Sequence, residues 1–242
     1  MRRERSILVL GAHSAHMGAL TDRIRALGYE SIRVKTPNEA IEIAIERNLE
    51  YGVGLFEPQG LAFNLIEALE SIRCRSNSLD MRYIATGEEP NDEECTKLRD
   101  AGISVALWAP VEDHALRFQL NASMSRNHEE FLRSEARAPI DVSATVKAGG
   151  RRKQVSVYSL SAGGAFLETA RPSMAGVDLE VTLLSPDGEL SLDAHVLYTN
   201  VPGNLSQPTL PLGMGVRFEN LGRSALDAIR QIVEFNSVAL SI

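Results

Sequence analysis

Arg133-Ser134-Glu135-Ala136-Arg137 places two arginines four residues apart, directly before a segment that alternates between apolar and polar residues. The second part of the pattern begins 22 residues after Arg137, in the stretch Ser159-Leu160-Ser161-Ala162-Gly163-Gly164-Ala165-Phe166. A run of serine and glycine between two apolar strands is typical of a tight turn, because glycine permits backbone angles that other residues avoid. The two stretches together predict a pair of strands with arginines at its entry and a turn at its far end.

The alternation continues through most of the chain that follows. Apolar residues at every second position predict half-buried strands, first at residues 140–146 and then near 155–157, 165–167, 177–184, 190–198 and 213–218. Pro186-Asp187-Gly188 is a strong turn signal between two of these strands, and residues 202–211, rich in Pro, Asn and Ser, predict a long loop. Apolar residues at helical spacing from Leu221 to Val233 predict a closing helix. Six strands and a helix indicate a small β-barrel.

These features resemble the PilZ domain, a family of small β-barrels that bind the bacterial second messenger cyclic di-GMP. The arginine pair resembles the family's RxxxR motif, and the serine-glycine turn resembles its Asp/Asn-x-Ser-x-x-Gly motif. Gly213-Met214-Gly215-Val216-Arg217-Phe218 is similar to a G-x-G-V-x-F run found late in the family. The resemblance implies a PilZ domain over residues 126–242, in which residues 126–138 are a linker that carries the arginines.

The resemblance also implies a ligand site for cyclic di-GMP. The expected ligand-binding residues are Arg133, Arg137, Ser159, Ser161, Gly163 and Gly164. Guanidinium groups suit this ligand, since they meet phosphate or guanine with paired donors and stack on purine rings. Glycines let the backbone turn sharply and approach the nucleotide closely. A protein of this kind is a signalling effector and not an enzyme, so no catalytic residue, metal or cofactor is expected.

Ser159 departs from the family pattern, which has Asp or Asn at this position. A short hydroxyl does not replace the paired contacts of a carboxylate or an amide. The loss of one good contact to a base costs about 1–3 kcal/mol. Such a cost weakens a micromolar site by about tenfold or more.

The first half of the chain has a different pattern. Short apolar runs at residues 7–10, 31–35, 53–56, 83–86 and 103–108 alternate with amphipathic segments of helical period. Five strand-helix units in a row predict a parallel sheet covered by helices on both faces. This α/β domain is expected to occupy residues 1–125 and to precede the β domain.

The order and length of these units resemble the flavodoxin-like receiver domain of bacterial response regulators. Receivers have acidic residues after strand one, a phosphoacceptor Asp after strand three, Thr or Ser after strand four and Lys after strand five. Here strand one runs into Gly11-Ala12-His13, strand three into Glu57, and strand five into Ala109, while Thr86 matches. Phosphoryl transfer needs oxygen ligands for Mg²⁺ and a cation on the phosphate. We therefore expect a pseudo-receiver that is not phosphorylated.

Charge and cysteine content narrow the classes of partner. The chain of 242 residues has a net charge of −7, divided as −5 over residues 1–125 and −2 over residues 126–242. An acidic chain disfavours binding to a nucleic acid polymer, so an anionic ligand must meet a local cluster such as Arg133, Arg137 and residues 151–153. Two cysteines without metal-ligand spacing and the lack of any apolar run of membrane length predict a cytoplasmic protein.

Residues 121–133 contain no Pro or Gly, so we expect a helical link between the domains. Ligand binding at the arginine pair would then rearrange the two domains and alter a surface for an unidentified protein partner. Receiver-like domains often self-associate through their fourth and fifth helices, which is compatible with a homodimer. Two other hypotheses stay open: a degenerate scaffold that binds proteins without nucleotide, and an active phosphorelay receiver that controls the barrel.

Overall fold

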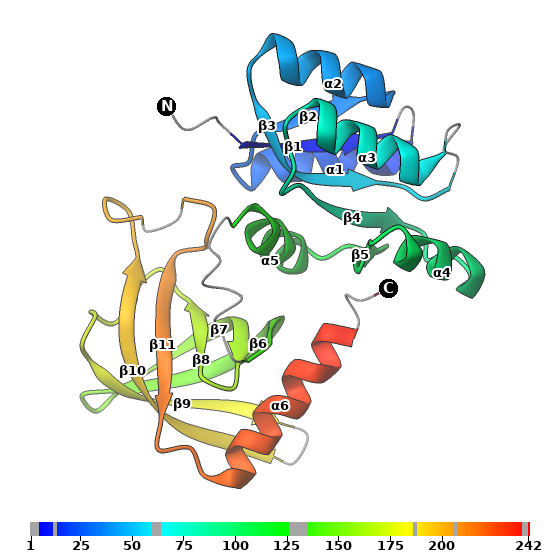
Figure 1. Cartoon of the computed structure of the whole chain (residues 1–242). Coiled ribbons are helices and arrows are strands. Elements are labelled where there is room, and N and C mark those ends of the chain that lie inside the picture. The colour runs from blue at the N-terminus through cyan, green and yellow to red at the C-terminus, as the bar shows by residue number, and fades with distance from the viewer. Residues whose placement is uncertain are drawn as a thin grey trace. The chain divides into compact units, whose positions relative to one another are not determined.

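The computed structural model describes the chain except residues 1–4, 12–13, 60–63, 126–134, 186–187, 206–207 and 239–241, and it leaves out the side chain of residue 238. The chain divides into two compact units. One comprises Met1–Arg126 with Leu240–Ile242, and the other comprises Asn127–Ala239. Figure 1 shows that the first unit is a sheet with helices and the second a barrel with one helix.

The first unit alternates strands and helices throughout. Its elements are β1 (Arg5–Leu10), α1 (Ala15–Ala26), β2 (Ser31–Val34), α2 (Pro37–Glu46), β3 (Glu50–Phe56), α3 (Leu65–Arg75), β4 (Arg82–Gly87), α4 (Asp92–Asp100), β5 (Val105–Trp108) and α5 (Asp113–Met124). The strands are parallel and stand in the order β2-β1-β3-β4-β5. This is the doubly wound order of flavodoxin-like receivers, and it confirms the fold predicted for this half.

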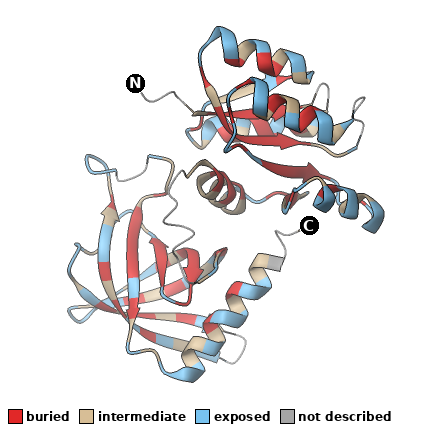
Figure 2. Cartoon of the chain, viewed as in Figure 1, coloured by how far each residue is buried: buried red, intermediate tan, exposed pale blue. Residues whose placement is uncertain are grey.

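The sheet is buried on both faces, which explains its continuous apolar strands. One helix layer packs Ile41 and Ile72 from α2 and α3 against one face, and Leu98 of α4 belongs to the same core. The other layer packs Ile24 of α1 and Leu116 of α5 against the opposite face. Figure 2 shows the resulting band of buried residues along the central strands.

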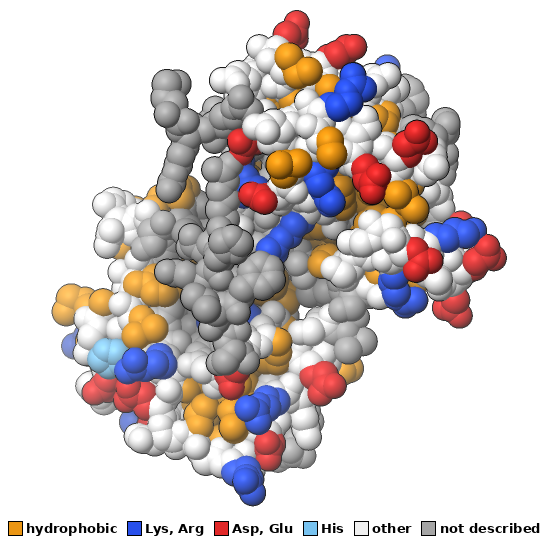
Figure 3. Space-filling model, in the orientation of Figure 1, with side chains coloured by type: hydrophobic (Ala, Val, Ile, Leu, Met, Phe, Trp, Pro, Cys, Tyr) orange, Lys and Arg blue, Asp and Glu red, His pale blue; other side chains and the backbone are white. Residues whose placement is uncertain are grey.

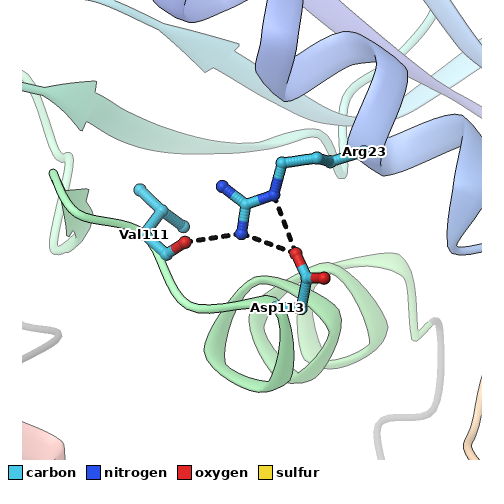
Figure 4. A network of polar contacts seen from close by, with 3 residues as sticks. All are labelled: Arg23, Val111 and Asp113. Carbon is cyan, nitrogen blue, oxygen red and sulfur yellow. Dashed lines mark hydrogen bonds and ion pairs between the residues drawn. The ribbon is translucent and has the colours of Figure 1, made fainter.

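A polar contact joins the first and last helices of this unit. Arg23 of α1 donates from Nε to Oδ1 of Asp113, at the start of α5, over 2.8 Å. Its Nη2 donates to the carbonyl of Val111, just before α5, and to the same carboxylate (Figure 4). Asp113 is the acidic residue of the first turn of α5. Arg23 therefore fixes where α5 begins against α1.

The helix α5 is shorter than the sequence predicted. It ends at Met124, and Ser125 has the extended backbone angles φ −66° and ψ 126°. The predicted helical link through residue 133 is therefore wrong at Ser125, where the extended backbone ends the helix. The remainder of that segment lies outside the described residues.

The second unit is a closed barrel of six antiparallel strands and a C-terminal helix, as predicted. Its elements are β6 (Arg137–Ala148), β7 (Arg151–Ser161), β8 (Gly164–Glu168), β9 (Asp178–Ser185), β10 (Gly188–Asn200), β11 (Gly213–Glu219) and α6 (Arg223–Val238). The strands close in the order β10-β11-β8-β7-β6-β9. Side chains that point inward fill the barrel, and Ile229 and Val233 of α6 belong to the same core.

One boundary differs from the prediction in a way that matters for the site. Arg137 was expected in a linker, whereas it is the first residue of β6 and pairs with Ser161. Pro139 interrupts the apolar alternation near the start of this strand, and the register shifts between Pro139 and Val142. A proline has no N–H for the ladder and often accompanies such an irregularity. For that reason the alternation in the sequence did not reveal that the strand begins at Arg137.

None of the described helices combines the length and the apolar composition needed to cross a bilayer.

Candidate functional site

Arg137 lies on the outer face of the barrel, at the start of β6. Its neighbour Ala138 points into the core, so the arginine side chain points outward. Nη1 of Arg137 donates to Oγ of Ser159 over 3.2 Å. The side chain is half-buried, which means that its guanidinium is held close to the barrel wall near the end of β7.

Ser159 and Ser161 lie two residues apart at the end of β7. Both are buried, with exposed fractions of 2% and 8%. The hydroxyl of Ser161 donates to the carbonyl of Gly164 over 3.1 Å and so closes the turn between β7 and β8. Ser159 stands between Pro139 on β6 and Phe166 on β8. Ser159 is therefore enclosed by its two neighbouring strands and bonded to Arg137.

The two glycines of the turn have different roles. An ideal Cβ on Gly164 would lie 2.2 Å from the carbonyl oxygen of Val216, so the backbone of β11 leaves no room for a side chain. Among the described residues, a Cβ on Gly163 would meet only Oε2 of Glu135, at 3.8 Å. Gly163 is exposed, and its carbonyl accepts the N–H of Phe218 over 3.0 Å. Gly164 is needed for packing, whereas Gly163 leaves an open backbone surface.

The structure brings five of the six predicted site residues together, on neighbouring strands and one turn. They are Arg137, Ser159, Ser161, Gly163 and Gly164. Arg133 lies outside the described residues. A guanidinium, two hydroxyls and an open turn thus face the same side of β6, β7 and β8.

Three charged residues, Glu135, Arg217 and Arg230, make contacts near the turn that were not predicted. Glu135 forms an ion pair with Arg230 of α6, with 3.5 Å between Oε1 and Nη2. Arg217 of β11 pairs directly with Gly164 in the sheet register. No local pattern in the sequence points to these contacts, because they join residues far apart in the chain.

An aromatic group covers the same outer face. Phe166 lies between Tyr158 and Tyr198, with ring centroids 5.8 Å and 6.2 Å away. A Cβ on Gly215 would lie 2.3 Å from the Tyr198 ring, so that glycine makes room for the ring. Tyr198 is 38% exposed, and Figure 3 shows hydrophobic side chains among charged ones on the visible face. The wall beside Ser159 is therefore aromatic.

The basic cluster at residues 151–153 is separate from this group. Arg151 and Arg152 are exposed at the start of β7, at the opposite end of that strand from Ser161. Nζ of Lys153 donates to the carbonyl of Arg171 over 2.8 Å, and partial burial lowers the pKa of Lys153. These residues form a strand start away from Ser161, and they do not join Arg137 in one cluster as the sequence suggested.

A second polar group lies at the carboxyl ends of the parallel strands in the first unit. Ser14 donates to Oε1 of Glu57 over 2.9 Å. Nε2 of His16 lies 3.2 Å from Oγ1 of Thr86, which in turn donates to the carbonyl of Leu107 over 2.9 Å. The Thr86 proton is thus engaged, which assigns the donor role in the first contact to Nε2 of His16.

A cavity of about 340 Å³ opens at this edge of the sheet. It is lined by His16, Glu57, Gln59, Gly87, Glu88 and Ala109. His16 belongs to the first turn of α1, and its side chain contacts Thr86 of β4. Glu57 is half-buried and accepts the Ser14 hydroxyl. His13 lies outside the described residues.

Known proteins that are similar to this chain match one half of it at a time. Residues 131–235 match the family model described as PilZ domain. No curated protein matches the chain in sequence. Among solved structures, the inhibitor of motility MotI of Bacillus subtilis is similar at 14% identity and a TM-score of 0.37, over 44% of this chain and 51% of that one. This chain thus spans about half the length of MotI.

Two further structures are similar to one half each. The PilZ domain of Escherichia coli YcgR, solved with c-di-GMP, is 19% identical with a TM-score of 0.35, over 44% of this chain and 92% of that one. The signal receiver domain of an HD domain-containing protein from Pseudomonas fluorescens is 16% identical with a TM-score of 0.44, over 55% and 96% of the two chains.

Proposed function

From the PilZ domain at residues 131–235, we propose that this chain is a non-enzymatic receptor for cyclic di-GMP. One observation carries the proposal. Arg137, Ser161 and Gly164 are direct neighbours across β6, β7 and β8, so residues from both ligand motifs stand together on one outer face. A cyclic dinucleotide has two phosphates and two guanines, and this set offers paired donors, hydroxyls and an open backbone to them.

Binding at this face would require Arg137 to exchange partners. One of its present acceptors is the Ser159 hydroxyl, which is a neutral group. A phosphate is a stronger acceptor for a guanidinium than a hydroxyl, because it carries a negative charge and accepts two parallel N–H···O bonds. The exchange would also release the Ser159 hydroxyl from its contact with Arg137.

Residues 126–138 connect the two units in sequence and carry both arginines of the first motif. Ordering of this segment by the ligand would favour one arrangement of the receiver-like unit over others, which is how a bound ligand shifts a conformational equilibrium. The proposed output is a change in a surface that binds a protein partner, with the chain acting in the cytoplasm. A homodimer through the receiver-like unit is compatible with this output.

Isothermal titration of the full chain with cyclic di-GMP tests the proposal. We expect saturable binding with a Kd in the micromolar range, and a loss of about tenfold or more in Arg137→Ala and Arg133→Ala, since each variant removes one paired contact. Arg152→Ala is the matched control, because it removes an exposed arginine of β7 at the opposite end of the strand from Ser161. The absence of heat with the wild-type chain, or equal affinities in all variants, contradicts the proposal.

A ligand-free scaffold is the second candidate, and the buried serine at position 159 favours it. Ser159→Asp separates the two candidates. In a receptor, the new carboxylate restores a strong acceptor in the site, and the affinity should rise by about tenfold. A scaffold would gain no nucleotide binding from the same change, and titration of both proteins under identical conditions distinguishes these outcomes.

A further inference from the structure

Arg217 is placed directly across the serine-glycine turn from Arg137. The sheet register pairs Arg137 with Ser161, Ser161 with Gly164 and Gly164 with Arg217. Val216 and Phe218 point into the core, so the Arg217 side chain lies on the outer face together with Arg137. The turn therefore has one arginine on each side.

The strand β11 lies unusually close to the turn. The N–H of Phe218 donates to the carbonyl of Gly163 over 3.0 Å, and a Cβ on Gly164 would lie 3.2 Å from Cα of Arg217. Neighbouring strands lie about 4.8 Å apart, so the three steps from Arg137 to Arg217 span roughly 14 Å between Cα atoms.

Arg217 is also available for a ligand. Its side chain is 58% exposed and forms a surface ion pair with Glu219, with 3.0 Å between Nη2 and Oε1. Such exposed pairs contribute little to stability and are screened by salt, so a phosphate competes well with the carboxylate. Glu219 thus holds Arg217 in the free protein without locking it.

We propose that Arg217 is an affinity-determining residue of the nucleotide site, which binds from β11 the half of the ligand that lies away from Arg137. The proposal rests on the proposed function, and it adds a third arginine that neither motif contains. Arg217 offers paired donors to the second phosphate or to a guanine edge. Glu219 opposes binding, since it competes with the ligand for the same guanidinium.

Titration of the full-length Arg217→Ala variant with cyclic di-GMP tests this role. We expect the Kd to rise by about tenfold, the size of one lost charge-assisted contact, while Arg152→Ala leaves it unchanged. Arg217→Lys should recover part of the loss, because lysine keeps the charge but not the paired donors. The thermal unfolding of Arg217→Ala should match that of the wild type, since the side chain is exposed.

Glu219→Gln provides a second test, in which the Kd for cyclic di-GMP is expected to fall and not to rise. Loss of the competing carboxylate should tighten binding by about threefold in the wild-type chain and should have no effect in the Arg217→Ala background. An equal gain of affinity in both backgrounds would mean that Glu219 acts through its charge alone and not through Arg217. That result would overturn its assigned role.

The two proposals fail in different ways. Unchanged affinity in Arg217→Ala, together with loss of binding in Arg137→Ala, overturns the role of Arg217 and leaves the proposed function standing. A weakening in Arg217→Ala no larger than that in Arg152→Ala has the same meaning. A wild-type chain that gives no binding overturns both proposals.

Discussion

At the scale of single residues, the glycines of the turn show most clearly how packing and ligand access are divided. Gly164 is required by the close approach of the β11 carbonyl at Val216, whereas a Cβ on Gly163 would make only ordinary van der Waals contact with Glu135 among the described residues. The two residues are adjacent in sequence and are both glycine, so their different roles can be recognised only from the structure. The family motif has its conserved glycine at position 164.

Gly164→Ala should destabilise the barrel. A Cβ at 2.2 Å from a backbone oxygen forces the strands apart, and overpacking of this kind costs about 1–3 kcal/mol. Gly163→Ala should change stability by less than about 0.5 kcal/mol, as expected for an unhindered surface position. Urea unfolding of both variants measures the difference, and equal midpoints would show that β8 and β11 are not in close contact at this turn.

The Arg137 and Ser159 contact was only partly accessible from the sequence. The motif spacing predicted that both residues belong to the site, but not that Arg137 donates to Ser159. Arg217 and Arg230 escaped prediction, because their neighbours Gly164 and Glu135 are 53 and 95 residues away in the chain. Contacts of this range depend on barrel closure and leave no local signal.

At the scale of elements, periodicity predicted the order of strands and helices well, and the ends of elements less well. The apolar runs and helical faces gave five strand-helix units and six barrel strands, which the structure confirms. Two boundaries were missed for definable reasons. α5 ends at Met124 without a Gly or Pro stop signal, and Pro139 interrupts the pattern at the start of β6.

A buried tyrosine joins two elements of the receiver-like unit and makes its stability sensitive to alkali. The hydroxyl of Tyr51 on β3 donates to the carbonyl of Ala40 on α2 over 2.8 Å. Burial raises the pKa of Tyr51 to about 12, above the value of 10.0 expected for an unfolded chain. The folded state therefore holds the proton more tightly, so the stabilisation is complete below pH 10 and is lost as the pH rises toward 12.

Tyr51→Phe should flatten this dependence. The variant lacks the ionisable group, so the urea midpoint of the receiver-like unit should fall less between pH 10 and pH 12 than in the wild type. Burial also raises the pKa of Tyr83, which leaves a residual slope in the variant. Tyr198→Phe, which removes a hydroxyl from the barrel unit, is the control. Identical slopes for wild type and Tyr51→Phe would contradict the assignment.

At the scale of the whole molecule, the two units differ in how many residues of the expected functional motifs they contain. The barrel brings the arginine, the serines and the glycine of the proposed ligand site together on one face. The receiver-like unit keeps the sheet order and Thr86, but Glu57 follows β3 and Ala109 follows β5. Under the proposed function, the barrel receives the signal and the receiver-like unit transmits it.

Incubation with acetyl phosphate and Mg²⁺ should leave the chain unmodified. Phosphoryl transfer to a receiver needs a cation on the incoming phosphate, and Ala109 stands where receivers have lysine. The Glu57 carboxylate is also engaged by the Ser14 hydroxyl. Intact-mass measurement should show no added phosphoryl group. A gain of mass in the wild type that is lost in Glu57→Gln would show an active receiver.

A crystal structure of the full chain grown in excess cyclic di-GMP tests the central claim most directly. The account predicts nucleotide on the outer face of β6, β7 and β8, with the guanidinium of Arg137 turned away from Ser159 and hydrogen-bonded to a phosphate or a guanine. A structure from such crystals with no nucleotide on this face, and with Arg137 still donating to Ser159, would contradict it.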